Sequence, residues 1–320
     1  MVDVATGRPR IGLLKGDLMK PPLLILCATD LSADADLAVV AADDMARLFE
    51  SRLVFVHAVP YPAPAQVLFP HLVRGTTDRL MAVSRVASET VAARVASLTA
   101  RRAEDVDVRV DVGAPDEVIV DTAEESGADL LVIGVAGSDS QEGELGTAAL
   151  RIARHAHCPV LVVRKGPAKG PILAATDLSD PAQGALAIAS LLSAKFGEPM
   201  VALHVVDYSP VVVVPEAFGP GIPIPVSDEE HTAVLKAAGD RLIEVLTRLE
   251  IKADRLVEEG APPDRIVAVA EQIEARPVVV GTEGGGGLRR MLLGSVAEDV
   301  LRLAPCSVLL VRHHKSGGHE

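Results

Sequence analysis

The sequence contains no tryptophan, and aromatic residues make up only 2% of its 320 residues. The 49% of hydrophobic residues are therefore mainly valine, leucine, isoleucine and alanine, a composition typical of a parallel sheet that helices cover on both faces. At this length we expect about two domains, each large enough to bury a core of its own.

Long apolar runs are also absent, and none approaches the roughly eighteen residues that a membrane span needs. The N-terminal residues lack the hydrophobic region and cleavage site of a signal peptide, so we expect a cytoplasmic protein without a membrane partner. Basic residues are outnumbered: the net charge is −13 and the isoelectric point is about 5.2. This balance argues against nucleic acid as a partner.

Cysteine is scarce and lacks the paired spacing of a zinc site or a redox motif. Cys27, Cys158 and Cys306 each lie in or beside an apolar run, which predicts small core residues. His155 and His157 straddle the expected end of a helix, so they should not converge with Cys158 on a metal. We therefore predict no metal site.

The second half of the chain repeats the first. Thr29-Asp30-Leu31-Ser32 recurs as Thr176-Asp177-Leu178-Ser179, an offset of 147 residues that holds as far as Gly137 and Gly284. After that point the offset is 148, as Cys158 and Cys306 show. We predict a leader at 1–20, domains at 21–165 and 171–313, and a tail at 314–320.

Each copy alternates apolar strands with amphipathic helices, which predicts a parallel sheet with right-handed crossovers. In the first copy the strands are expected at 23–28, 53–59, 106–112, 129–134 and 159–163, and the helices at 34–49, 76–102, from 115 and at 147–156. A polar linker of residues 164–170 joins the copies.

The stretch from Gly281 to Ser295 holds six glycines in fifteen residues. It follows an expected strand at 277–280 and precedes an expected helix from Val296. Glycines let several backbone N–H groups approach one anion, and the start of a helix adds unpaired N–H groups and the positive end of its dipole. This order predicts a phosphate site, with a flexible loop tip as the alternative.

The spacing of Gly281, Gly284, Gly294 and Ser295 resembles the nucleotide loop of the universal stress protein family. The resemblance extends over both halves. It implies two Rossmann-like α/β domains, each a five-stranded parallel sheet of order 3-2-1-4-5 with helices on both faces. It also implies an ATP-binding stress-response regulator. Two alternatives stay open: a scaffold of the same family that binds proteins and no nucleotide, and a slow ATPase or autophosphorylating protein without an assigned catalytic residue.

The resemblance further implies a site in the second half. Ala175, Thr176 and Asp177 would flank the adenosine, Met200 and Val201 would pack on adenine, and Val280 and Gly281 would line base and sugar. The phosphates would meet Gly284, Gly294, Ser295 and Val296, and also Arg289 and Arg290 unless these are solvated surface arginines.

Two residues of this site have a second interpretation, and Glu283 departs from the family's pattern. Asp177 could serve its own turn by bonding backbone, and Ser295 could form a capping box with Glu298. Glu283 stands where a histidine is common in the family, and a carboxylate about 8 Å from a triphosphate costs roughly 1 kcal/mol. Mg²⁺ bridging the two would remove that cost, so ATP with or without Mg²⁺ is expected.

The first copy has a shorter and more acidic loop. Only eight residues separate Gly137 from Gly146, and Asp139, Glu142 and Glu144 give the loop a formal charge of −3, against +1 for the second loop. We predict that the first half does not bind ATP well.

Family members pair domains through the fifth strand, so 161–163 and 309–311 are the expected contact between halves or between subunits of a homodimer. The Pro-rich insertions at 60–74 and 209–226 expose apolar residues and are expected to pack between halves or subunits. His57 and His204, at the same place on the second strand, are expected to be structural.

Overall fold

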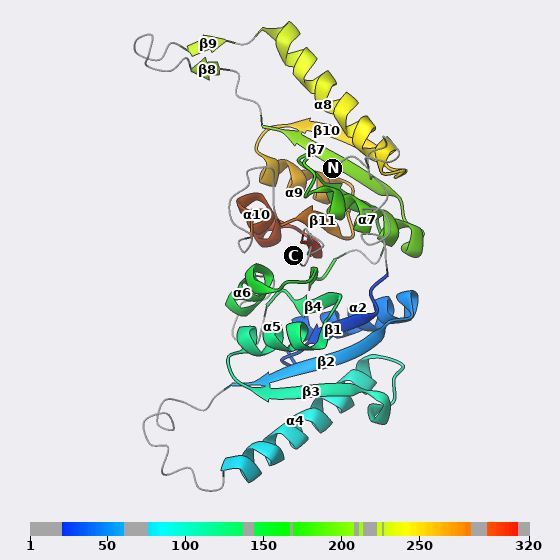
Figure 1. The fold of residues 1–320 in the computed structure, drawn as a ribbon, viewed down its shortest axis with the longest axis vertical. Coiled ribbons are helices and arrows are strands. Elements are labelled where there is room, and N and C mark those ends of the chain that lie inside the picture. Colours follow the sequence, from blue (N-terminus) through cyan, green and yellow to red (C-terminus); the bar gives the residue numbers. More distant parts are fainter. Residues whose placement is uncertain are drawn as a thin grey trace, which may run out of the picture.

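The computed structural model describes residues 21–60, 76–136, 144–166, 169–207, 211–213, 223–225, 227–282 and 293–312. One ten-stranded sheet runs through this part of the chain in the order β10-β7-β6-β11-β12-β5-β4-β1-β2-β3 (Figure 1). Each half contributes five parallel strands in the predicted order 3-2-1-4-5. The predicted fold is confirmed.

In the first half the elements lie close to the expected ranges. They are β1 Leu24–Ala28, α2 Ala33–Phe49, β2 Arg52–Val59, α4 Thr76–Leu98, a 3₁₀ turn at Ala103–Asp105, β3 Asp107–Val112, α5 Pro115–Ser126, β4 Leu130–Gly134, α6 Thr147–His155 and β5 Val160–Val163. Proline at the first position of α5 starts that helix, and Gly127 ends it in the left-handed conformation at φ 63°.

The second half repeats this series. Its elements are β6 Ile172–Ala175, α7 Gln183–Phe196, β7 Met200–Val206, β8 Val211–Val213, β9 Pro223–Pro225, α8 Asp228–Arg248, β10 Asp254–Glu259, α9 Pro262–Gln272, β11 Val278–Gly281, α10 Ser295–Leu303 and β12 Val308–Val311. At α8 a capping box forms between Ser227 and Glu230, where each side chain bonds the other residue's backbone N–H.

Two apolar cores lie on the two faces of the sheet, and both run through the two halves. Helices α5, α6, α9 and α10 cover one face, and α2, α4, α7 and α8 cover the other. Neighbouring residues of a strand serve opposite cores, as Ile25 and Leu26 do, because side chains alternate along a strand. Strands buried on both faces explain the almost uninterrupted apolar runs in the sequence. In the described part of the chain no helix is long and apolar enough to cross a membrane.

The halves meet where β5 and β12 pair antiparallel, with Leu161 opposite Leu309. These fifth strands would otherwise be open sheet edges with unpaired backbone groups. Their pairing makes the two five-stranded sheets one.

Two arginines related by the repeat reinforce this junction. Arg164 donates through Nη2 to the carbonyl oxygen of Leu301, at 2.6 Å, near the end of α10. Arg312 donates in the same way to Ala153 and Arg154, at 2.8 and 2.7 Å, near the end of α6. A cation at a helix C-terminus binds unpaired carbonyl groups and complements the helix dipole, so each half caps a helix of the other.

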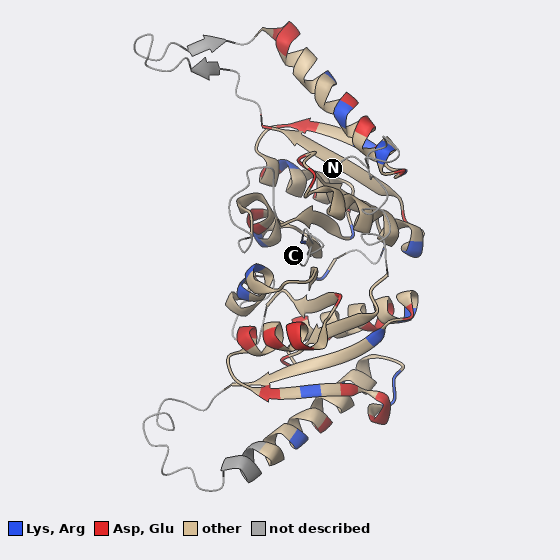
Figure 2. Ribbon diagram, viewed as in Figure 1, with Lys and Arg blue, Asp and Glu red and all other residues tan. Residues whose placement is uncertain are grey.

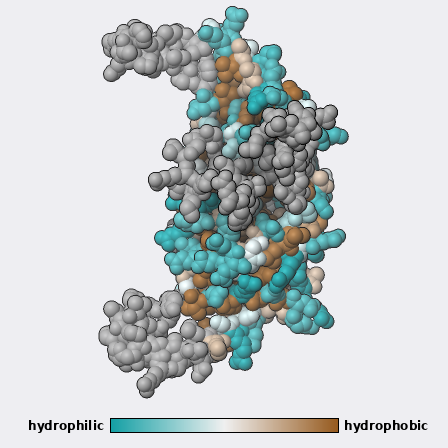
Figure 3. Space-filling model, viewed as in Figure 1, coloured by the Kyte–Doolittle hydropathy of each residue, from teal (hydrophilic) through white to brown (hydrophobic). Residues whose placement is uncertain are grey.

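The Pro-rich insertion of the second half contains a structure that the sequence did not predict. Val211–Val213 and Pro223–Pro225 form a two-stranded antiparallel hairpin, consistent with the β-branched valines and with proline at a sheet edge. The hairpin lies at the end of the molecule far from the first half (Figure 1), so it does not pack between the halves. Packing between subunits, the other expectation for this insertion, stays a prediction. The insertion at 60–74 lies almost wholly outside the described residues. On the face shown in Figure 3, apolar side chains also reach the surface along α8, where Val234 and Ile243 are about two-fifths exposed.

Candidate functional site

The candidate site lies at the carboxyl ends of β6 and β11 in the second half. These neighbours are parallel, with Ala175 opposite Val280. The order in which successive strands join the sheet reverses between them, and such a switch point opens a crevice above the strand ends. A cavity of about 240 Å³ occupies this place. We call it the edge cavity.

Eight of the residues predicted from the sequence line the edge cavity. They come from three separate stretches of the chain: Ala175, Thr176 and Asp177; Val280 and Gly281; and Gly294, Ser295 and Val296. The folded chain therefore brings together the turn after β6, the end of β11 and the start of α10.

The predicted adenine contacts Met200 and Val201 do not line this cavity. Both lie at the amino end of β7, where Met200 pairs with Ile172, whereas the edge cavity opens at the carboxyl ends of the strands. Leu203 and Val205, farther along β7, line it instead. Three more of the predicted residues, Gly284, Arg289 and Arg290, lie outside the described residues, as does Glu283.

The turn that carries Asp177 is held by its own side chains. Asp177 Oδ1 accepts from the backbone N–H of Ser179 at 3.0 Å and from its hydroxyl at 2.5 Å, and Thr176 Oγ1 accepts from the N–H of Leu178 at 3.0 Å. Leu178 has φ 64°, which an L-residue adopts at a cost of about 1 kcal/mol, and these bonds offset it. Asp177 itself is exposed and faces the cavity. The turn interpretation of Asp177 is thus correct, and it leaves the carboxylate at the cavity.

His204 braces the same turn from β7. Its Nδ1 lies 2.8 Å from the carbonyl oxygen of Thr176, and His57 makes the same 2.8 Å contact with Thr29 in the first half. Each histidine ties the end of the second strand to the end of the first, as the structural interpretation predicted.

At the start of α10 the capping box between Ser295 and Glu298, one of the two interpretations of Ser295, is absent. The N-cap is Gly294, whose N–H donates to Thr282 at 2.9 Å, and no side chain caps the helix. Ser295 is the first helical residue and is exposed beside the cavity. The first N–H groups of a helix lack intrahelical acceptors, so this end can receive an anion.

Glu298 is used elsewhere, in a contact between the halves. Its oxygens accept from Arg154 Nη2 of α6 at 2.9 and 2.8 Å, and Arg302 Nη2 adds a bond of 2.9 Å. The bonds from Arg154 are the main reason that the pKa of Glu298 is lowered; burial opposes them. The contact fixes α10, and with it the cavity wall, against the first half.

Several lining residues escaped the sequence analysis. The apolar wall is formed by Leu203, Val205, Pro262 and Ile266, and Thr282 lies below it with 1% of its surface exposed. The signal for Leu203 and Val205 was the period of two along β7, which places alternate side chains on one face near the strand end. Nothing local in the sequence marks Thr282.

The corresponding edge of the first half keeps the backbone geometry. Gly146 is the N-cap of α6 and its N–H donates to Val135 at 2.8 Å, as that of Gly294 does to Thr282. A side chain on Gly134 would come within 2.8 Å of the backbone of Asp34, because α2 begins close against this strand end. Residues 137–143 of the acidic loop lie outside the described residues, and Glu144 is exposed.

Other chemistry-bearing groups do not form a second candidate site in the described residues. No group of three or more histidine, cysteine, aspartate or glutamate side chains there is arranged to hold a metal ion. The three cysteines are free thiols and buried, and burial raises the pKa of Cys158 and of Cys306 to about 11.

A protein-family model described as the universal stress protein family matches the chain twice, over residues 24–164 and 170–312. Among curated relatives, universal stress protein Rv2623 of Mycobacterium tuberculosis (strain H37Rv) is 34% identical over 191 residues, 57% of this chain and 61% of that protein. The match thus spans less than two thirds of that relative. Universal stress protein MJ0531 of Methanocaldococcus jannaschii is 35% identical over 148 residues, 45% of this chain and 82% of that protein.

Solved structures agree on the fold. A universal stress protein from Archaeoglobus fulgidus DSM 4304 superimposes with a TM-score of 0.63 at 20% identity, covering 91% of this chain and 98% of that one. The two family matches coincide with the two halves of the ten-stranded sheet. The chain therefore belongs to the universal stress protein family, whose domain it contains twice.

Proposed function

We propose that the edge cavity of the second half binds ATP and that the protein acts as a nucleotide-dependent stress-response regulator. The observation that carries the proposal is the convergence of three distant stretches on one cavity at the switch point of the sheet. The cavity offers an apolar wall, a carboxylate and a helix N-terminus. A nucleotide presents a base, a ribose and phosphates, which suit these three features in turn.

Each feature has a role in this proposal. The base packs between Leu203, Val205 and Ile266, because a flat apolar surface gains from burial against aliphatic side chains. The ribose hydroxyls donate to Asp177. The phosphates bind the N–H groups at the start of α10 and the Ser295 hydroxyl, where the helix dipole favours negative charge.

A cavity of about 240 Å³ suits the nucleoside better than a whole nucleotide. The outer phosphates are therefore assigned to the loop 283–292, where Gly284, Arg289 and Arg290 are the proposed contacts. Mg²⁺ fits here as a bridge between the phosphates and Glu283, and its place in the proposal is tested by titrations with and without the metal.

We propose a binding protein rather than a fast enzyme. Among the described residues that line the cavity, Asp177 is the only ionisable one, and the ribose occupies it. General-base catalysis needs a group within hydrogen-bond reach of the attacking water. Slow hydrolysis or autophosphorylation is the alternative if the loop 283–292 supplies such a group.

A protein-binding scaffold is the second candidate function. Exposed apolar side chains on α4 and α8 favour it, above all Met81 and Val86, which are 67% and 56% exposed. Surfaces of this kind are typical of protein contacts when they gather in one patch. The scaffold does not need an occupied edge cavity.

The nucleotide content of the purified protein separates these functions. Protein prepared without added ligand is denatured, its supernatant is run on an anion-exchange column, and fresh protein is titrated with ATP with and without Mg²⁺. We expect about one ATP per chain, because one site of the two is intact. Two equivalents would contradict the assignment of a silent first half, and none, with no heat on titration, would leave the scaffold as the function.

A further inference from the structure

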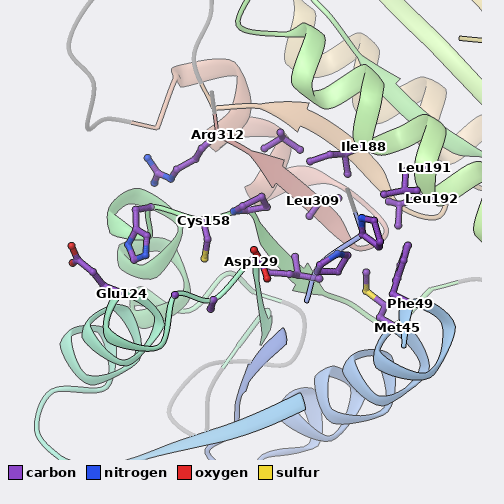
Figure 4. A pocket seen from close by; sticks show the side chains of 18 residues that line it. Met45, Phe49, Glu124, Asp129, Cys158, Ile188, Leu191, Leu192, Leu309 and Arg312 are labelled. Carbon is purple, nitrogen blue, oxygen red and sulfur yellow. The ribbon is translucent and has the colours of Figure 1, made fainter. Parts of the chain in front are cut away.

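A second cavity, larger than the edge cavity and separate from it, lies between the two halves. Its volume is about 510 Å³, and we call it the interface cavity (Figure 4). Helix α2 contributes Met45 and Phe49, α7 of the other half contributes Leu191 and Leu192, and β12 contributes Leu309. Apolar side chains from both halves thus face one space.

Two charged groups at the edge of this cavity, Asp129 and Arg312, already have partners. Asp129 Oδ2 accepts from the N–H groups of Leu23 and Leu24, both at 2.9 Å, and Arg312 donates to α6. A ligand that needs strong polar recognition would have to compete with these bonds. The cavity is therefore suited to an apolar occupant.

The internal repeat shows what fills the equivalent place in the other half. Cys158 lines the interface cavity, and its counterpart is Cys306. The linker between the halves runs over Cys306: a Cβ on Gly166 would lie 3.6 Å from the Cys306 Cβ. Farther along the linker, a Cβ on Gly170 would lie 2.2 Å from the carbonyl oxygen of Glu274, so the backbone there leaves no room for a side chain. In the second half, the place equivalent to the interface cavity is therefore filled by a peptide segment, the linker.

The counterpart of the linker is the segment that enters β1. Residues 164–170 lead into β6, and with the offset of 147 they correspond to residues 17–23, which place Met19 where the linker has Gly166. Pro21 and Pro22, the last residues of this segment before β1, already line the interface cavity. The residues before them are apolar at Ile11, Leu13, Leu14, Leu18 and Met19.

The C-terminal tail is a weaker match to the same path. The linker starts on a clamp in which the Ser307 hydroxyl bonds the backbone N–H and C=O of Arg164, at 3.1 and 3.3 Å. The counterpart of Ser307 is Pro159, which cannot make these bonds. The tail after Arg312 is also polar, with histidines, a lysine and glycines.

We infer that residues 13–20 of this chain occupy the interface cavity, along a path that mirrors the linker and places Met19 over Cys158. Since the cavity has walls from α2 and α7, the segment contacts both halves. It acts as a second strap that holds the halves together, opposite the covalent linker. The inference is independent of nucleotide binding.

Disulfide formation tests this path with a matched control. Gly166→Cys is the control, because its Cβ would lie 3.6 Å from that of Cys306, within the range found in disulfides. Met19→Cys is the test, with Cys158 as its partner. Each full-length variant is oxidised with copper phenanthroline and mapped by mass spectrometry of its peptides. We expect the disulfide between Met19→Cys and Cys158 to form in the same yield as the disulfide between Gly166→Cys and Cys306.

The native thiols make the two halves comparable. Cys158 and Cys306 are both buried with pKa values raised to about 11, so different acidity does not explain a different yield. Cys27 is fully buried and not part of either pair. In the double variant Met19→Cys with Cys158→Ser, the cysteine at position 19 has lost its partner and should stay a free thiol.

Two results would overturn the inference. One is a Met19→Cys thiol that stays reduced while the Gly166→Cys control links. The other is linkage of Cys158 to His314→Cys, which occupies the corresponding position in the tail and would assign the cavity to the C-terminus. Alkylation gives an independent readout. The double variant Leu18→Ser with Met19→Ser should speed the alkylation of Cys158 and leave the rate for Cys306 unchanged. An unchanged rate for Cys158 would also contradict the inference.

Discussion

The two halves of the chain share a backbone and differ in charge at the edge where nucleotide is proposed to bind. Asp30 and Asp177 make the same turn, each accepting from a serine N–H at 3.0 Å. Gly146 and Gly294 start equivalent helices with φ −66° and −62°. The shared geometry shows that this turn and this helix start belong to the fold, whatever binds there.

The difference lies in the side chains around that geometry. Helix α5 carries five carboxylates and no basic residue, and its counterpart α9 carries two carboxylates and one arginine. In the ribbon of Figure 2 the acidic residues of α5 are coloured red. Helix α2 also begins with Asp34 and Asp36, whereas the first turn of α7 has no acidic residue. The aspartate in the turn therefore does not distinguish the two halves, because both have it; the charge of the surrounding residues does.

The largest expected effect comes from placing the same change in both halves. Gly294→Asp puts a carboxylate at the proposed phosphate site, where repulsion at about 5 Å costs roughly 3 kcal/mol, or about a hundredfold or more in Kd. Gly146→Asp should leave ATP binding unchanged, because the first half is predicted to be silent. Calorimetric titration of both variants measures the contrast.

A steric contribution can be separated from the charge. A Cβ on Gly294 would lie 3.1 Å from the carbonyl oxygen of Thr282, so any side chain there forces a small shift. Gly294→Ala carries this shift alone and should bind ATP better than Gly294→Asp. Binding at wild-type strength by Gly294→Asp would end the assignment of the phosphate site.

Much of this fold can be read from the sequence, because the signals involved are local or repeated. Apolar runs fix the strands to within a few residues, and the constant offset of 147 shows that one unit occurs twice. The eight predicted residues that line the edge cavity follow strand ends or begin a helix, which are positions that topology alone brings together.

One of the errors arises where distance along the sequence hides a partner. Ser295 and Glu298 have the spacing of a capping box, yet Glu298 bonds Arg154, which lies 144 residues earlier. The choice of Met200 and Val201 placed the adenine contact at the amino end of β7, whereas strand direction brings Leu203 to the site. The partner of Glu298 is not written in the local pattern. The strand direction is, because the predicted sheet is parallel and the other site residues follow their strands, so Met200 and Val201 were chosen at the wrong end of β7.

A smaller effect is expected from the contact that only α10 makes. Glu298 bonds Arg154 of the other half, and its counterpart in α6 is Leu150. Glu298→Gln should lower the free energy of unfolding by about 1 kcal/mol at pH 7, a value reduced by solvent because the Arg154 side chain is 40% exposed. Urea unfolding of both proteins measures the difference.

The pH dependence of that difference follows from the lowered pKa of Glu298. A carboxyl whose pKa is lower in the folded state stabilises the fold above its unfolded pKa, and this is lost as pH falls through the folded value. The difference between wild type and Glu298→Gln should therefore shrink below about pH 4. In an Arg154→Met background the same comparison should show a smaller trend, because the main partner of Glu298 is gone; an equal trend there would remove the contact between halves as its cause.

The smallest expected effect concerns Thr282, whose counterpart in the first half is Val135. Thr282 Oγ1 donates weakly to the carbonyl oxygen of Val311, at 3.4 Å. Thr282 and its counterpart Val135 are each 1% exposed. Thr282→Val preserves shape and removes this bond, so the free energy of unfolding should fall by only about 0.5 kcal/mol. The Kd for ATP should change by less than about twofold, since a hydroxyl directed at backbone contributes little to a ligand. A tenfold loss of affinity instead would mean that the hydroxyl turns to the nucleotide, and would add Thr282 to the features that distinguish the second half from the first.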